Sequence, residues 1–88
     1  MSGDSAVYSS IWQEHAVSAA ARFLKDDPQG PRQLFASVDL LADDPRPLGS
    51  TAYGSPALRR MHVGAYRAVY EIVEATPMVV VIHVGRLG

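Results

Sequence analysis

The sequence predicts an α+β fold in which a hairpin of two helices packs on a twisted antiparallel sheet, in the element order βααβββ. Apolar residues recur at helical spacing between residues 14 and 41, whereas the chain from residue 58 onward is rich in β-branched and aromatic residues. With 88 residues and a 48% hydrophobic composition, the chain can bury one core but not two. Residues 1–88 are therefore expected to form a single domain.

Two segments have the pattern of amphipathic helices. The first runs from about Glu14 to Lys25 and stops at residues 26–28, Asp-Asp-Pro. The second begins at Pro31, a residue suited to a first helical position, and ends before the same three residues at 43–45. The apolar positions of the two stripes are Val17, Ala20, Ala21, Leu24, Leu34, Phe35, Val38 and Leu41.

Four segments have the composition of strands. They are residues 6–12, 58–63, 66–73 and 78–84. Short turns separate the last three, which are therefore expected to form an antiparallel meander. The last segment is apolar on both faces, which predicts an inner position in the sheet. Residues 46–56 contain two prolines and two glycines and are expected to be an irregular loop.

The charge of the chain is unevenly distributed. The net charge of −1 argues against a general polyanion binder, because affinity for nucleic acid depends on neutralising phosphates. Residues 1–45 carry three bases and seven acids, whereas residues 46–88 carry five bases and two acids. Any anion-binding function is therefore expected in the second half of the chain.

Strand alternation groups the charged residues of that half. On the third of the four strands, Arg67 and Glu71 share one side and the tyrosines lie on the other. On the strand before it, Arg60 and His62 share a side. On the last strand, simple alternation puts His83 on the same side as the alternate valines of its apolar run.

A favourable register between these strands would gather four functional side chains on one surface of the sheet. They are Arg60, His62, Arg67 and His83. Two cations and two imidazoles within reach of a phosphodiester could stabilise the phosphate, take a proton and return one. This combination predicts a catalytic site for RNA backbone cleavage.

Ordinary structural roles are the alternative for the same residues. An arginine in mid-strand is commonly solvated or paired, and Arg67 could pair with Glu71. His83 could be a structural histidine, and His15 looks like a surface residue. The tyrosines at 53, 66 and 70 could stack on bases, although core or rim positions are commoner for such residues.

The sequence gives no support for a bound metal, a cofactor or a membrane-spanning segment. No acidic residue lies at metal-ligand spacing from a histidine, so neither a metal site nor a cofactor is expected. No apolar run approaches the roughly 20 residues that span a bilayer, and the N-terminus lacks the pattern of a secretory signal. The chain has no cysteine, which fits a reducing compartment, and a cytoplasmic location is expected.

Residues 58–72 and 80–86 resemble the sheet core of the RelE/ParE family, the toxins of bacterial type II toxin–antitoxin systems. The shared pattern is basic-x-x-x-Gly-x-Tyr-Arg-x-x-Tyr, which starts at Arg60, followed by an apolar strand that ends in Val-Gly-Arg. The resemblance implies the βααβββ fold, a cognate antitoxin as a partner, and the ribosome and mRNA as partners of the RelE branch. That branch cleaves mRNA in the ribosomal A site by acid–base chemistry.

The resemblance also implies roles for individual residues. Arg67 matches the family's phosphate-stabilising arginine, and Arg60 matches a basic residue on the preceding strand. His83 or His62 would carry the proton. Leu87 stands where the family has a further arginine. The residues expected to contact RNA are Arg59, Arg86 and Tyr66.

Three functions fit this resemblance. The first is a ribosome-dependent mRNA endoribonuclease that inhibits translation, so that the chain would be an enzyme. The second is a ParE-like inhibitor of DNA gyrase, which the low net charge and Leu87 favour. The third is a catalytically inactive binding module with the toxin fold.

Overall fold

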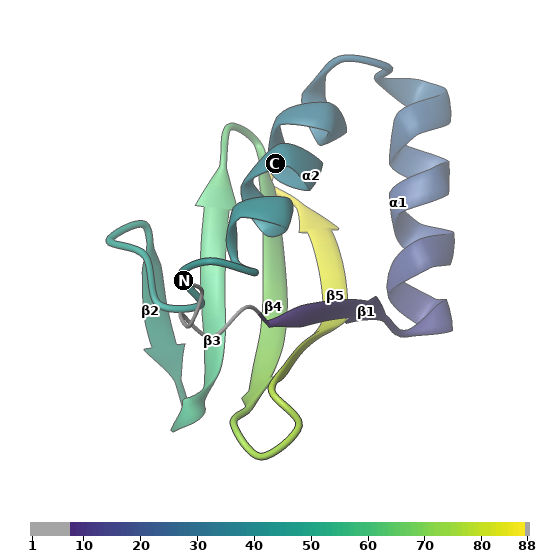
Figure 1. The fold of residues 1–88 in the computed structure, drawn as a ribbon. Helices are drawn as coiled ribbons and strands as arrows, with labels where there is room; N and C mark the ends of the chain where they lie inside the picture. Colours follow the sequence, from purple (N-terminus) through teal and green to yellow (C-terminus); the bar gives the residue numbers. More distant parts are fainter. Residues whose placement is uncertain (1–7, 88) are drawn as a thin grey trace.

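In a computed structural model, residues 8–87 are described as two helices packed on one side of a five-stranded sheet (Figure 1). The helices are α1 (Glu14–Asp26) and α2 (Gly30–Leu40). The strands are β1 (Ser9–Trp12), β2 (Ser50–Tyr53), β3 (Ser55–Val63), β4 (Tyr66–Val73) and β5 (Met78–Arg86). Both predicted helices and the four predicted strands are present, although the first two residues of the segment 6–12 lie outside the described residues.

The sheet differs from the expected one at two points. Its strand order is β1-β5-β4-β3-β2, and β1 pairs with β5 in parallel while all other pairs are antiparallel. The sheet is therefore mixed. After β1 the chain passes through both helices and the three antiparallel strands β2, β3 and β4, and β5 then lies beside β1. The segment 46–56, expected to be an irregular loop, contains β2, which forms a tight hairpin with β3. Gly54 closes that hairpin with a φ of 92°, a conformation that favours glycine.

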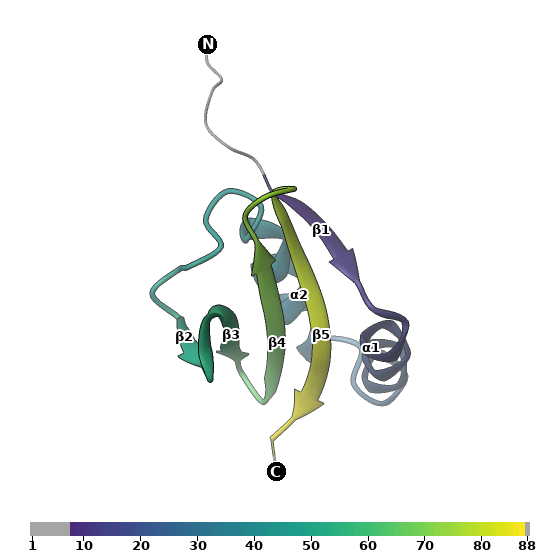
Figure 2. The same ribbon diagram turned by 90° about the horizontal axis from the view of Figure 1, so that it is seen from below.

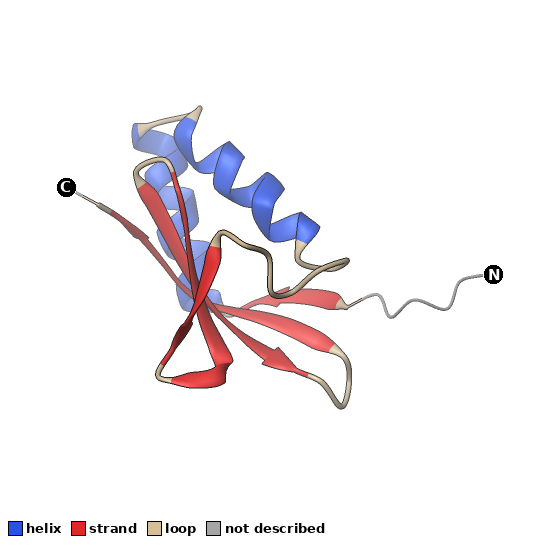
Figure 3. Cartoon of the chain, turned by 90° about the vertical axis from the view of Figure 1, so that its left-hand side faces the viewer, coloured by secondary structure: helices blue, strands red, loops and turns tan. Residues whose placement is uncertain are grey.

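The two helices cover the sheet unequally. Figure 2 shows α1 alongside the β1–β5 edge and α2 behind β4, and Figure 3 shows both helices on one side of the strands. The small residues Ala16 and Ala19 are buried on α1, which allows the helix to approach β5 closely. On α2, Leu34 and Val38 are fully buried against the sheet.

The core lies between the helices and the alternate residues of the inner strands. On β4 these residues are Tyr66, Ala68, Tyr70 and Ile72. Facing them on β5 are Val79, Val81 and Val84. We call this side of the sheet the covered face, and the opposite side the open face. As expected, β5 occupies an inner position with a partner on each side.

Hydrogen bonds from tyrosines join the helical half of the chain to the sheet. The buried hydroxyl of Tyr70 donates to the carbonyl oxygen of Pro45 at 2.7 Å. The hydroxyl of Tyr66 donates to Oδ2 of Asp27 at 2.8 Å.

Neither α1 nor α2 is long and apolar enough to cross a membrane.

Candidate functional site

The strand register puts the predicted catalytic residues on the open face. His62 on β3 pairs with Arg67 on β4, and Arg67 pairs in turn with Gly85 on β5. Directly paired residues point to the same side of a sheet. Since the neighbours of Arg67 on β4, Tyr66 and Ala68, are buried under the helices, this row faces away from them.

A second row, two residues further along β4, adds the other two candidates. Arg60 on β3 pairs with Val69, and Val69 pairs with His83 on β5. Although Val69 lies on the side of the sheet opposite α1 and α2, only 8% of it is exposed. Neighbouring side chains therefore close over it, and Val69 forms an apolar floor between Arg60 and His83.

A β-bulge brings His83 into this group. Simple alternation along β5 would put His83 on the same side as Val79 and Val81, which are buried in the core. The pairing of β4 with β5 shifts between Val69 and Tyr70, so that Tyr70 faces Val81 while Val69 faces His83. The extra residue reverses the side from which His83 projects. The period-two expectation for its side is therefore wrong.

Arg67 and His83 converge above Gly85. A Cβ atom at Gly85 would lie 3.1 Å from Nε2 of His83 and 3.3 Å from Nε of Arg67. The missing side chain of Gly85 thus leaves the space that both groups border. A phosphate oxygen in this space would contact a fixed cation and an imidazole together.

His15 is a member of the cluster that the sequence does not identify. It was expected at the surface, and it is exposed, but its ring lies 6.0 Å from that of His83 with an angle of 21° between the planes. The stack forms because β1 pairs only with residues 78–81 of β5, and α1 begins directly after β1 beside the rest of that strand. The apolar pattern of α1 does not report which of its exposed polar residues lies beside β5.

The arginines of the open face are not engaged by acids. Within residues 8–87, neither Arg60 nor Arg67 forms a salt bridge. The possible pair of Arg67 with Glu71 is therefore absent, and Glu71 is exposed opposite Leu58 and Val80. Neither guanidinium charge is neutralised by an acid of the described part of the chain, so both can attract an anion.

Arg60 contacts an aromatic ring instead. Its Cζ lies 5.2 Å from the ring centroid of Tyr53, a residue of β2 that is 46% exposed. The Nε atom of Arg60 is buried without a hydrogen-bond partner among residues 8–87. The guanidinium of Arg60 therefore lies beside an exposed aromatic ring at one end of the open face.

The three residues expected to contact RNA do not lie on the open face with the predicted catalytic residues. Arg59 is half-buried, and its Nε and Nη2 donate to the hydroxyl and carbonyl oxygens of Ser50 at 2.9 and 3.1 Å. Tyr66 is 1% exposed, so its ring is not accessible for stacking. Arg86 forms a salt bridge with Asp26 at 2.7 Å. These side chains belong to the covered face or its rim.

Their local electrostatics suit a structural role. The hydroxyl of Tyr66 and the N–H of Gly30 lower the pKa of Asp27. Burial and the same carboxylate raise the pKa of Tyr66. Hydrogen bonds to Asp26 and Tyr66 raise the pKa of Arg86. The group joins the turn between the helices to the ends of β4 and β5.

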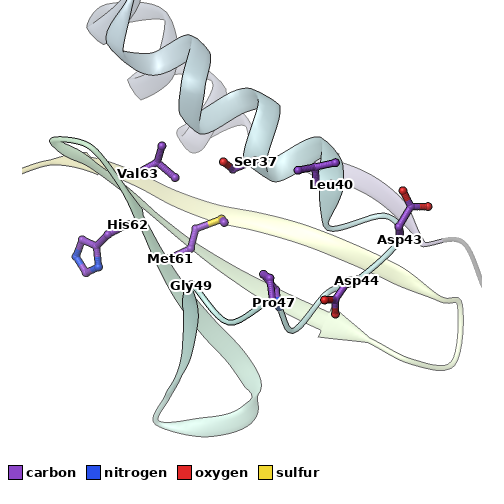
Figure 4. Close-up of a pocket in the computed structure, with 9 residues that line it drawn as sticks. All are labelled: Ser37, Leu40, Asp43, Asp44, Pro47, Gly49, Met61, His62 and Val63. Atoms are coloured by element: carbon purple, nitrogen blue, oxygen red, sulfur yellow. The ribbon is translucent and has the colours of Figure 1, made fainter.

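A pocket opens on the covered side between α2 and β3 (Figure 4). It has a volume of about 460 Å³, and Leu40, Asp43 and Met61 are among its lining residues. Figure 4 shows the imidazole of His62 pointing away from Met61 and the other side chains around the pocket.

Residues 8–87 contain no group of three or more His, Cys, Asp or Glu side chains that could hold a metal.

Comparison with known proteins identifies the family. Residues 12–87 match the model of the ParE toxin of the type II toxin–antitoxin system parDE. The chain belongs to this toxin family. No curated protein matches it in a sequence search.

Solved toxin structures have the same fold. The isolated E. coli RelE toxin superposes with a TM-score of 0.79 at 22% identity, over 92% of this chain and 85% of that one. RelE in the archaeal RelE–RelB complex from Pyrococcus horikoshii OT3 gives 0.76 at 19% identity, over 93% and 97%. A chain of the chromosomal ParDE system from P. aeruginosa gives 0.71 at 10% identity, over 96% and 100%.

Proposed function

We propose that this toxin is a ribosome-dependent mRNA endoribonuclease that acts through the open face of its sheet. The observation that supports the proposal is the gathering of Arg60, Arg67, His62 and His83 on one face, where neither arginine is paired with an acid of residues 8–87. A site built to cleave a phosphodiester needs cations for the developing charge and groups that move protons. The open face supplies both.

The proposed reaction uses the 2′-hydroxyl of the RNA as the nucleophile. One imidazole takes the proton of that hydroxyl while its oxygen forms a bond to the adjacent phosphorus. The bond from phosphorus to the 5′-oxygen breaks, and the other imidazole gives that oxygen a proton. The products are a 2′,3′-cyclic phosphate and a 5′-hydroxyl, and the reaction consumes no water.

The arginines act on the phosphate. Arg67, which borders the space above Gly85 with His83, would bind the non-bridging oxygens and stabilise the extra charge of the transition state. Arg60, one strand away, would bind the same or the next phosphate. A neutral imidazole can accept a proton and an imidazolium can donate one, so a histidine side chain can serve in either role.

The partners follow from this assignment. The ribosome would hold the mRNA in place, which explains how so small a site could act. The chain would then work in the bacterial cytoplasm. E. coli RelE and the P. horikoshii protein are known in complexes with their antitoxins, and we propose a cognate antitoxin here too.

Inhibition of DNA gyrase is the second candidate. The matching family model is that of the ParE toxin, and Leu87 replaces the basic residue that follows Val-Gly-Arg in RelE-like toxins. In that case the open face would bind a protein and would not catalyse a reaction.

Induced expression in a bacterial host tests the proposal. Growth and the 5′ ends of cellular mRNA are compared for the wild-type chain, Arg67→Ala and the matched control Arg22→Ala, which changes an exposed arginine of α1. Growth arrest with new in-frame mRNA cuts, lost in Arg67→Ala and kept in Arg22→Ala, is the expected result. Arrest with intact mRNA and broken DNA would support gyrase inhibition. If the expressed protein is folded but does not arrest growth, the remaining candidate is a catalytically inactive binding module with the toxin fold.

A further inference from the structure

We infer that Tyr53 and Arg60 form a nucleobase-binding subsite at the β2 end of the open face. The inference rests on the proposed function and adds the residue that holds the base of the RNA. Tyr53 is the exposed tyrosine among the three that could stack on bases, since Tyr66 and Tyr70 are buried on the covered face.

The position of Tyr53 follows from the hairpin. Thr51 on β2 pairs with Arg60 on β3, which puts the two side chains on the open face. The register shifts between Ala52 and Tyr53, and Gly54 then turns the chain back at positive φ. The ring of Tyr53 comes to lie beside the guanidinium of Arg60, 5.2 Å from ring centroid to Cζ.

The pair has the chemistry of a base platform. Unstacked bases of single-stranded RNA bind to aromatic rings and to the planes of arginine guanidinium groups. Tyr53 keeps 46% of its surface exposed although Arg60 contacts it, so part of the ring is open to a ligand. An exposed aromatic side chain beside a cation suits a ligand that has both a flat ring and a negative charge.

The distance to the phosphate site is longer than one nucleotide. Tyr53 lies two strand spacings from Arg67 across the sheet, about 10 Å, and about four residues from it along the strands, about 13 Å. The two side chains are therefore rooted about 16 Å apart. A base on Tyr53 would belong to a nucleotide further along the RNA than the one whose phosphate lies near Arg67 and His83.

A binding cycle tests the inference. The probe is a short fluorescein-labelled single-stranded RNA with 2′-O-methyl groups, which removes the nucleophile so that only binding is measured. A matched probe lacks the bases but keeps the backbone. Fluorescence anisotropy gives the Kd of both probes for the wild-type chain, Tyr53→Ala and Tyr53→Phe, and circular dichroism checks that each variant is folded.

The expected result is specific to stacking. Tyr53→Ala weakens binding of the base-containing probe about 5- to 100-fold and leaves the baseless probe within about twofold, whereas Tyr53→Phe binds both as the wild type does. Equal weakening of both probes would assign Tyr53 to backbone binding or to the support of Arg60 and overturn the inference. No effect of Tyr53→Ala, or no binding by the wild type, would overturn it too.

The binding assay and the expression assay together distinguish failure of the proposed subsite from failure of the proposed mRNA cleavage. If Tyr53 binds bases but expression leaves mRNA intact, the subsite stands and the proposed cleavage fails. If mRNA is cut and Arg67→Ala stops the cutting while Tyr53→Ala binds both probes normally, the nuclease stands and the subsite fails.

Discussion

Both faces of the sheet carry arginines and tyrosines, but these residues have different partners on the two faces. On the covered face, Tyr70 donates to the carbonyl of Pro45 and Arg59 donates twice to Ser50. On the open face, Arg60 and Arg67 form no salt bridge within residues 8–87. The side from which a residue projects therefore separates arginines that stabilise the fold from arginines available to a ligand. The following substitutions test this division.

The largest effect is expected for Arg67→Ala. Loss of one group that stabilises a transition-state charge commonly lowers a rate by about 100- to 1000-fold, and we expect this loss of mRNA cleavage. The free energy of unfolding should change by less than about 0.5 kcal/mol, because Arg67 forms no salt bridge with any residue that the structure describes. Cleavage rates and urea denaturation measure the two quantities. A large loss of stability would place Arg67 among the structural residues.

A substitution of Gly30, which lies against Tyr66 of the covered face, should lower stability and leave activity unchanged. A Cβ atom there would collide with Oδ2 of Asp27 and the ring of Tyr66. Gly30→Ala should therefore destabilise the protein by about 1–3 kcal/mol while the folded fraction stays active. Gly49→Ala is the matched control, because a Cβ atom at Gly49 meets no atom of residues 8–87 within 4 Å. Equal stability of the two variants in urea would contradict this packing.

A smaller loss of activity is expected for Gly85→Ala on the open face. The new methyl group would occupy the space that Arg67 and His83 border and would move one or both. We expect about a 10-fold slower cleavage, equivalent to about 1.4 kcal/mol, with little change in thermal stability. Unchanged cleavage would show that the reaction does not use this space.

The smallest effect is a change in the pH dependence of stability. Asp27 has a lowered pKa in the folded state, chiefly through the Tyr66 hydroxyl. Its contribution is therefore complete above the ordinary pKa of 3.8 and is lost as the pH falls through the lower folded value. Tyr66→Phe removes the main cause, so its deficit in melting temperature should shrink as the pH falls from about 6 to about 3. A constant deficit would contradict the linkage.

Local signals predicted the helices and the inner strands well. The Asp-Asp-Pro stops, the helical spacing and the β-branched segments each act over a few residues, and the structure confirms the elements that they predict. β2 was missed because the prolines and glycines on either side of it indicate a loop, and only pairing with β3 makes it a strand. The parallel pairing of β1 likewise depends on contacts far apart in the sequence.

The site was predictable in composition but not in geometry. Alternation grouped Arg60 with His62 correctly, whereas the bulge that turns His83 outward has no signal in a run of valines. The stacking of His15 on His83 depends on how α1 sits beside β5. Arg59 shows the same limit, since its partner Ser50 belongs to the strand that was missed.

Arg59 and Arg60 provide the most direct test of the division between the faces, because they are neighbours in the sequence and project to opposite sides of β3. Growth arrest and the free energy of unfolding should be measured for Arg59→Ala and Arg60→Ala. Arg59→Ala should lose about 1–2 kcal/mol of stability, since two hydrogen bonds disappear, and still arrest growth. Arg60→Ala should lose the arrest and at most about 1 kcal/mol, the value of its contact with Tyr53. Loss of arrest in Arg59→Ala with full activity in Arg60→Ala would contradict the assignment of function to the open face.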